Sequence, residues 1–274
     1  MPVNPWFQRQ IGVGLAGFCL LAASAQAATK LLVTVVEQKS RKPVTGITAE
    51  QFAVFDDKTP RRVESVEAAG RMLDVILLMD TSLQGAMVEP MAENLIAQLQ
   101  PKDQMAIVSV HSSADMIQDF TSSHELLVRS VSQVKYGNTP KLLDGLYATL
   151  DGGFQHTTFR RVVVLLTAGV EGNSRLNENE VIRLARRNGV SISVVYVIGF
   201  EKYLFDLLAK QTGGTSYNLK DMRKSREGPP GPVIFEGLRS YYTLTVSGDQ
   251  ALGEKIKVEV KRPEKVWTSA LPVE

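Results

Sequence analysis

The chain has 274 residues, of which 44% are hydrophobic and 22% are charged, and its formal net charge is +2. This composition is typical of a folded globular protein with enough apolar material for a large core, and it excludes an intrinsically disordered chain. The small net charge, and the absence of a basic run with interleaved aromatic side chains, exclude a nucleic-acid-binding surface from our expectations.

The first 27 residues differ in composition from the remainder of the chain. Arg9 is their one charged residue, an apolar stretch runs from Ile11 to Ala23, and Ala25-Gln26-Ala27 has the small-x-small form of a signal-peptidase site. The apolar stretch is shorter than the about 20 residues that a membrane-spanning helix needs. We therefore predict a secretory signal peptide over residues 1–27 and export to the periplasm or out of the cell. Cys19, the one cysteine, lies in this segment, so we expect no disulfide.

Residues 28–70 are predicted to form a small N-terminal β element. Segments rich in strand-forming residues occur at Leu31–Val36, Phe52–Phe55 and Val63–Val66, and polar turns separate them. The acidic run that begins at Asp56 has turn chemistry and lacks the alternating acidic residues of a calcium loop.

Residues 71–220 are predicted to form an α/β domain. Short apolar runs alternate there with amphipathic helical patterns, which is typical of a doubly wound, mainly parallel sheet with helices on both faces. Met87, Met91 and Leu95 recur at helical spacing and are expected to face the core. Ligands of such sheets bind beyond the carboxyl ends of the strands. We expect strands at Met72–Met79, Gln104–Val110, Arg161–Thr167 and Ser191–Ile198, and further helices at Ser123–Val134, Leu142–Phe154, Glu178–Asn188 and Tyr203–Gln211.

Residues 221–274 are predicted to form a linker and a C-terminal β-hairpin. The chain is charged and then rich in Gly and Pro over residues 220–232, which indicates an exposed loop. Alternating side chains over Tyr241–Val246 and Lys255–Lys261 favour a hairpin. Since β-rich segments flank the α/β domain in the sequence, one hypothesis is that they pair into one small β subdomain with the α/β domain inserted between them.

Three segments, in chain order, closely resemble motifs of the von Willebrand factor A-type (VWA) family. Leu73–Ser82 resembles the opening strand and first metal-site loop, Tyr136–Pro140 precedes a helix that contains Asp144-Gly145-Leu146-Tyr147, and Val162–Gly169 resembles the third strand. The flanks Val44–Phe52 and Tyr241–Leu244 resemble a VWA-related family abundant in acidobacteria. The resemblance covers nearly the whole mature chain, and it implies a Rossmann-like fold that serves as an interaction module.

The resemblance also implies a metal site, because metal-binding members hold a divalent ion with a D-x-S-x-S loop, a threonine and an aspartate. Asp80 and Ser82 match the first two positions of the loop, and Thr139 matches the threonine, although Asp144 lies one residue further from it than the usual pattern has. Gln84 stands where the second serine belongs, and Ala168 where the aspartate belongs. This degenerate set implies no cofactor, or weakly held Mg²⁺, Mn²⁺ or Ca²⁺.

The same residues also fit other roles. Asp80 at a strand end suits an acceptor of loop amides, and Ser82 could cap the helix that follows. Glu171, three residues past Ala168, is either a substitute ligand or a solvated loop residue. Arg183, Arg186 and Arg187 share the outer side of one predicted helix, which is either a solvated face or a surface for an acidic partner.

No catalytic motif announces an enzyme, because the sequence has no G-x-S-x-G elbow, H-E-x-x-H or Walker loop. His111, His124 and His156 are scattered, and His111 alone follows a predicted buried strand. The leading hypothesis is an exported, non-enzymatic protein–protein interaction module that works without a metal ion. The alternatives are a metal-dependent adhesion domain that binds an acidic residue of its partner, and an exported enzyme with an unrecognised site at the same strand ends.

Overall fold

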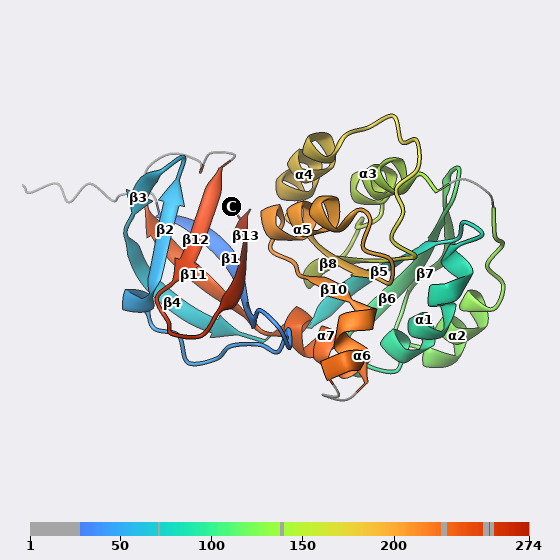
Figure 1. Ribbon diagram of the computed structural model, residues 1–274, viewed down its shortest axis with the longest axis horizontal. Coiled ribbons are helices and arrows are strands. Elements are labelled where there is room, and N and C mark those ends of the chain that lie inside the picture. Colours follow the sequence, from blue (N-terminus) through green and yellow to red (C-terminus); the bar gives the residue numbers. More distant parts are fainter. Residues whose placement is uncertain are drawn as a thin grey trace, which may run out of the picture.

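The computed structural model describes residues 28–70, 72–137, 140–225, 229–248, 252 and 255–273. These residues form an α/β unit and a smaller all-β unit that lie side by side (Figure 1). No helix within the described ranges has the length and apolar content needed to cross a membrane. The predicted signal peptide over residues 1–27 lies outside the described residues.

The α/β unit is built on a six-stranded sheet. Its strands pair in parallel, except that the edge strand β7 runs antiparallel to β6. Every residue of the central strand β5 is buried, as expected where helices cover both faces. The predicted doubly wound, mainly parallel sheet is therefore confirmed. In sheet order the strands are β10 (Ser216–Asn218), β9 (Ser191–Tyr196), β8 (Arg160–Thr167), β5 (Leu73–Asp80), β6 (Gln104–Val110) and β7 (Ala114–Thr121).

Helices cover both faces of this sheet (Figure 1). Side chains alternate along β5, so that Val75 and Leu77 join one core cluster and Ile76 and Leu78 join the other. The first cluster packs under α1 (Glu89–Ile96), α2 (His124–Val131), α6 (Leu219–Ser225) and α7 (Pro230–Arg239), and the second under α3 (Leu142–Gly152), α4 (Glu178–Arg187) and α5 (Lys202–Gln211).

Two expectations for the α/β unit are wrong. Met87 is 52% exposed and does not face the core, because residues Gly85–Val88 form a short 3₁₀ turn (η2) with three residues per turn. The α-helical phase begins only with α1, where Met91 and Leu95 are buried.

The loop expected over residues 220–232 is largely helical, since α6 and α7 lie there. Helix α7 tolerates a proline in its first turn and buries four apolar side chains in the core, so the α/β unit continues to Arg239.

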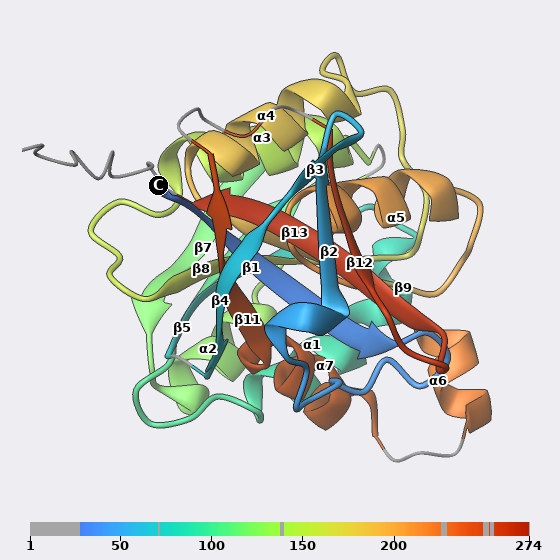
Figure 2. The same cartoon turned by 90° about the vertical axis from the view of Figure 1, so that its left-hand side faces the viewer.

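The all-β unit consists of two packed sheets (Figure 2). Alternate residues of β1 (Leu31, Val33 and Val35) are buried in the cluster between the sheets. The predicted hairpin of β11 with β12 is wrong, because these strands lie in different sheets. One sheet has the order β13 (Val266–Val273), β1 (Ala28–Glu37), β11 (Tyr241–Ser247) and β4 (Val63–Ala69), and the other has β12 (Ile256–Val260), β2 (Phe52–Asp56) and β3 (Thr59–Arg61), with a 3₁₀ turn η1 (Ala49–Gln51) before β2.

The two units are connected at two adjacent crossings and by side-chain contacts. The chain leaves the all-β unit after β4 and returns at β11, where Tyr241 is paired with Ala69. Thr34 Oγ1 donates a hydrogen bond of 2.8 Å to the Gly213 carbonyl, and Trp267 Nε1 donates one of 3.4 Å to the Gly214 carbonyl. These contacts fix the all-β unit against the amino-terminal ends of the central strands.

Candidate functional site

The carboxyl ends of β5, β6, β8 and β9 meet at the edge of the sheet opposite the all-β unit (Figure 1). The loop after β5 contains the residues that resemble the first metal-site loop. Its position is fixed from both sides, because Thr81 N donates to the Val110 carbonyl at 2.8 Å and Gly137 N donates to the Thr81 carbonyl at 2.7 Å. The backbone at the predicted site is therefore held in place by hydrogen bonds to two neighbouring segments.

Asp80, 1% exposed, accepts hydrogen bonds from two loops. Its Oδ1 accepts from Ser82 N at 3.0 Å, and its Oδ2 accepts from Thr167 Oγ1 at 2.8 Å and from Ala168 N at 3.2 Å. A carboxylate oxygen has two lone pairs, so Oδ2 is fully used and Oδ1 keeps one free lone pair. The carboxylate therefore joins the loop after β5 to the loop after β8.

Two hydroxyl groups beside Asp80 are buried without a hydrogen-bond partner among the described residues. They are Thr81 Oγ1 and Ser82 Oγ. A buried hydroxyl without a partner is costly, so each such group calls for a partner that the described residues do not supply. Ser82 Oγ is one of the oxygens that the family resemblance assigns to a metal ion.

Gln84 does not approach this centre. Its side chain is exposed, and the residue begins the η2 turn. The following Gly85 packs against the end of β5, where a Cβ would lie 1.8 Å from the Asp80 carbonyl oxygen. This close approach requires glycine at position 85.

Ala168 and Glu171 do not supply a second carboxylate. Ala168 is fully buried, its amide donates to Asp80, and its carbonyl accepts from Ile198 N at 2.8 Å. Glu171 turns toward α3, where its Oε2 accepts from Leu143 N at 3.2 Å, while its Oε1 accepts from Ser174 N at 3.2 Å. Burial raises the pKa of Glu171. Glu171 therefore fixes the start of α3, and both of its carboxylate oxygens already accept hydrogen bonds from backbone amides.

His111 and Asp144, also singled out from the sequence, form none of the hydrogen bonds to Asp80 that the described residues make. Thr139 lies outside the described residues. His111 packs against Gly137, where a Cβ would come within 2.7 Å of its ring, and its Nδ1 accepts from Ser112 N at 2.6 Å. Asp144 Oδ1 accepts from the amides of Arg175 and Leu176, at 2.9 and 3.0 Å, so it holds the loop after β8.

The oxygen atoms around Asp80 are fewer than a divalent cation needs. Hard cations require about six oxygen ligands, several of them carboxylates or waters. Within the described residues, no three His, Cys, Asp or Glu side chains cluster in a way that could hold a metal ion. Among the described residues at this edge, the available side-chain oxygens are Asp80 Oδ1, with one free lone pair, and the two unpaired hydroxyls Thr81 Oγ1 and Ser82 Oγ. This set does not fit a resident cation held by protein ligands.

Sequence reasoning missed the exposed apolar side chains at the same edge. Leu83 and Met87, in and after the β5 loop, are 65% and 52% exposed, and Phe200 and Tyr203, after β9, are 83% and 80% exposed. Leu83 stands between Ser82 and Gln84, and Phe200 between Gly199 and Glu201, so a large apolar residue within a polar turn was the signal that could have identified them. Several large apolar side chains exposed at one edge offer apolar area that a partner could bury.

Comparisons with known proteins agree with this architecture. The family model for the von Willebrand factor type A domain matches residues 74–227. A solved structure of proximal thread matrix protein 1 from the mussel byssus, with a zinc-occupied MIDAS motif, has 17% identity and a TM-score of 0.54, and the match covers 66% of this chain and 50% of the mussel protein. This chain thus spans about half the length of the mussel protein.

Two further similarities are to smaller proteins. The SpRpn10 VWA domain is 15% identical with a TM-score of 0.43, over 59% of this chain and 97% of that domain. The conserved hypothetical protein BatB from Bacteroides thetaiotaomicron is 12% identical with a TM-score of 0.47, over 62% of this chain and 100% of BatB. A search of curated proteins found no match.

Proposed function

Because the chain belongs to the von Willebrand factor type A domain family, we propose that it is an exported, non-enzymatic protein-interaction module that binds its partner at the carboxyl-terminal edge of the central sheet. The module works without a resident metal ion. Export is inferred from the composition of residues 1–27, whose apolar stretch and Ala25-Gln26-Ala27 have the form of a cleavable signal.

The single observation that carries this proposal is the exposure of Leu83 and Phe200 at the same edge of the sheet as the buried Asp80. Burying one such side chain against a partner contributes about 1.5–3 kcal/mol, and binding energy concentrates in a few side chains of this kind. Asp80 joins the loop that carries Leu83 to the loop after β8, and the Ala168 carbonyl of that second loop accepts a hydrogen bond from Ile198 N, two residues before Phe200. The loops are thus held in place before the partner arrives, which lowers the entropy cost of binding.

The absence of a resident cation is inferred from the donor set. Asp80 already accepts three hydrogen bonds, Gln84 is exposed, and Ala168 offers a backbone amide where a ligand would need a carboxylate. The amide of Ala168 stabilises the negative charge of Asp80 that a metal ion would otherwise neutralise.

The test is partner binding by edge variants. The purified protein is used to isolate its partner from the source organism, and the purified partner is then titrated by calorimetry with and without EDTA. Leu83→Glu and Phe200→Glu are expected to weaken binding about tenfold or more, which corresponds to about 1.4 kcal/mol. Met116→Glu is the matched control, since Met116 is 50% exposed on β7, and it is expected to bind like the wild type. Edge variants that bind with wild-type affinity would contradict the proposal.

A metal-dependent adhesion domain is the second candidate, because Ser82 Oγ is buried beside Asp80 without a partner and the similar mussel protein holds zinc in its motif. A cation that binds only the folded state raises the melting temperature. Thermal unfolding is therefore measured with EDTA and with Mg²⁺, Mn²⁺, Ca²⁺ or Zn²⁺. A rise that Ser82→Ala abolishes supports this second candidate, and an unchanged melting temperature supports the cation-free module.

A further inference from the structure

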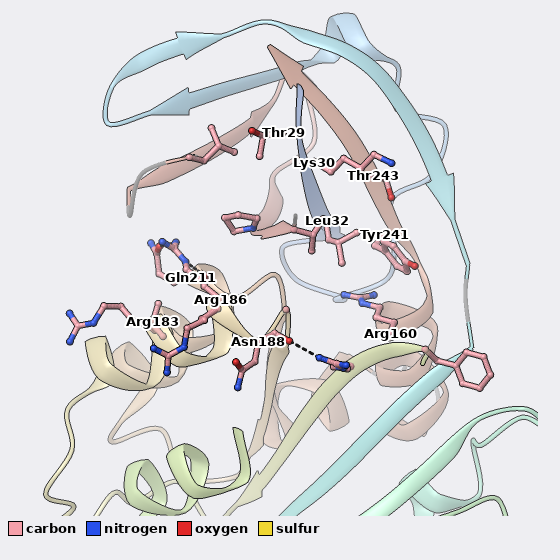
Figure 3. A pocket seen from close by; sticks show the side chains of 18 of the residues that line it. Thr29, Lys30, Leu32, Arg160, Arg183, Arg186, Asn188, Gln211, Tyr241 and Thr243 are labelled. Atoms are coloured by element: carbon pink, nitrogen blue, oxygen red, sulfur yellow. Dashed lines mark hydrogen bonds between the residues drawn. The ribbon is translucent and has the colours of Figure 1, made fainter. Parts of the chain in front are cut away.

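A cleft of about 1590 Å³ lies between the all-β unit and the α/β unit (Figure 3). One wall is the face of the four-stranded sheet that carries Lys30, Leu32 and Thr243, and the other is formed by the start of β8 and the end of α4. The amino-terminal ends of β8 and β9 open into it, whereas Asp80 lies at the carboxyl-terminal end of β5. The cleft is therefore a second surface, at the opposite edge of the sheet from the proposed partner site.

Basic side chains dominate the lining of the cleft, whereas Glu67 is the one acidic side chain among its described residues. Arg183 and Arg187 on one wall and Lys30 on the other are exposed and form no ion pair with a described residue. A concave surface lined by one sign of charge focuses the electrostatic potential and attracts oppositely charged ligands. The basic lining residues are Lys30, Arg160, Arg161, Arg183, Arg186, Arg187 and Lys255.

Arg160 adds a buried charge to the wall of the cleft. Its guanidinium donates hydrogen bonds to the Leu238 carbonyl and to Ser191 Oγ and lies 4.1 Å from the centre of the Tyr241 ring. Its Nε is buried without a partner, and none of the described carboxylates pairs with it. Burial lowers the pKa of Arg160 to about 10, so the group stays charged at neutral pH. A buried cation without a counter-ion is costly, and a carboxylate in the cleft would offset part of that cost.

The stability of α4 alone does not explain why basic side chains gather on both walls of the cleft. Cations in the last turn of α4 stabilise the helix dipole, and Arg186 Nε also donates to the Gln211 carbonyl at 2.8 Å. These contacts explain why arginines occur at the end of α4. They do not explain Lys30 and Lys255, which approach from the all-β unit.

Apolar side chains complete the lining and indicate the class of ligand. Leu32 and Pro272 lie on the sheet wall, and Ile182 and Leu207 on the helical wall. The volume exceeds the about 300–1000 Å³ of a small-molecule pocket. Basic and apolar groups in one open cleft fit a polypeptide that carries both carboxylates and apolar side chains, better than a small anion or an uninterrupted polyanion. We propose that this cleft binds an acidic, partly apolar segment of a partner protein.

The test uses a fluorescein-labelled peptide of repeated Glu-Glu-Leu units and measures its binding to the purified protein by fluorescence anisotropy at low ionic strength. Arg183→Glu combined with Arg187→Glu is expected to weaken binding about tenfold or more, because two attractive charges become repulsive. Lys30→Glu, on the opposite wall, is expected to weaken it independently of any effect on α4. Arg223→Glu combined with Lys224→Glu makes the same charge change on α6, outside the cleft, and is expected to change the affinity less than about twofold.

Three outcomes overturn the proposal. The peptide could bind the cleft variants as tightly as the wild type, or the α6 control could weaken binding as much as the cleft variants do. Polygalacturonate could also bind in a manner that depends on Lys30 while the peptide does not, which would assign the cleft to an anionic polysaccharide. Leu83→Glu and Phe200→Glu change the partner site and leave the cleft unchanged. These variants should therefore still bind the peptide even if they no longer bind the partner, so the two proposals can fail separately.

Discussion

Removal of the Asp80 carboxylate is the most direct test of how the strand-end network works. Asp80→Ala leaves the buried amides of Ser82 and Ala168 without an acceptor, while the Thr167 hydroxyl can rotate to a new partner. Each buried amide left without a partner costs about 1–3 kcal/mol. Removing a buried carboxylate also relieves part of its desolvation cost. We expect the free energy of unfolding to fall by about 3 kcal/mol.

The assay is urea unfolding of the wild type and the variant, followed by circular dichroism, with EDTA and separately with millimolar Mg²⁺. The network explanation requires the same loss in both buffers, because the lost partners are backbone amides. Asp115→Ala is the control, since Asp115 is exposed on β7, and its change should stay within about 0.5 kcal/mol. If Asp80→Ala were as stable as the wild type in EDTA and less stable only with Mg²⁺, Asp80 would be a metal ligand and this reasoning would be wrong.

Three further changes test other parts of the structure by urea unfolding. Tyr217→Phe removes a buried hydroxyl with no described partner and should raise stability at pH 7 by about 1 kcal/mol. Burial also raises the pKa of Tyr217 to about 12. Between about pH 10 and pH 12 the tyrosine therefore ionises in the unfolded state before it ionises in the folded state, which lowers the stability of the wild type, and the variant should lose less stability over that range. Gly145→Ala should cost about 1–3 kcal/mol, because its Cβ would lie 2.2 Å from Val110 Cγ2, whereas Gly152→Ala meets no atom within 4 Å and should cost nothing. Arg239→Ala should cost about 3 kcal/mol by leaving the buried Asp103 without its cation. Wild-type stability in Tyr217→Phe, Gly145→Ala or Arg239→Ala, or equal losses in the two glycine variants, would contradict the corresponding argument.

The sequence predicted the central sheet because a parallel strand covered on both faces leaves a continuous apolar run, such as that of β5. It could not predict which strand β12 pairs with, since alternating side chains define the faces of a strand and not its neighbours. The helical character of residues 230–239 was hidden by two prolines and two glycines in the segment.

For the candidate site, the positions of the residues were predictable from the sequence, but the contacts of their side chains were not. The positions of Asp80, Gln84 and Ala168 at the strand end followed from the sequence. Two of the three hydrogen bonds to the Asp80 carboxylate come from a loop 87 and 88 residues further along the chain, and such long-range contacts leave no local signal. Arg183 and Arg187 were expected on a helix surface, but Lys30 on the facing wall appears only when the two units are placed together.

The pairing of β1 has a consequence for the order in which the protein folds. This first strand pairs with β11 and β13, and Leu32 of β1 lies opposite Thr243 of β11. Its neighbours are therefore synthesised roughly 200 residues later. The α/β unit contains its own core, and all of its strands are synthesised before β11, so it can fold while β1 still lacks a partner. Until synthesis is complete, β1 presents two unpaired edges rich in Val and Leu, which are prone to pair with other chains. A binding protein or chaperone that covers residues 28–37 during synthesis or export would therefore raise the yield of the folded protein more than one that acts on the α/β unit.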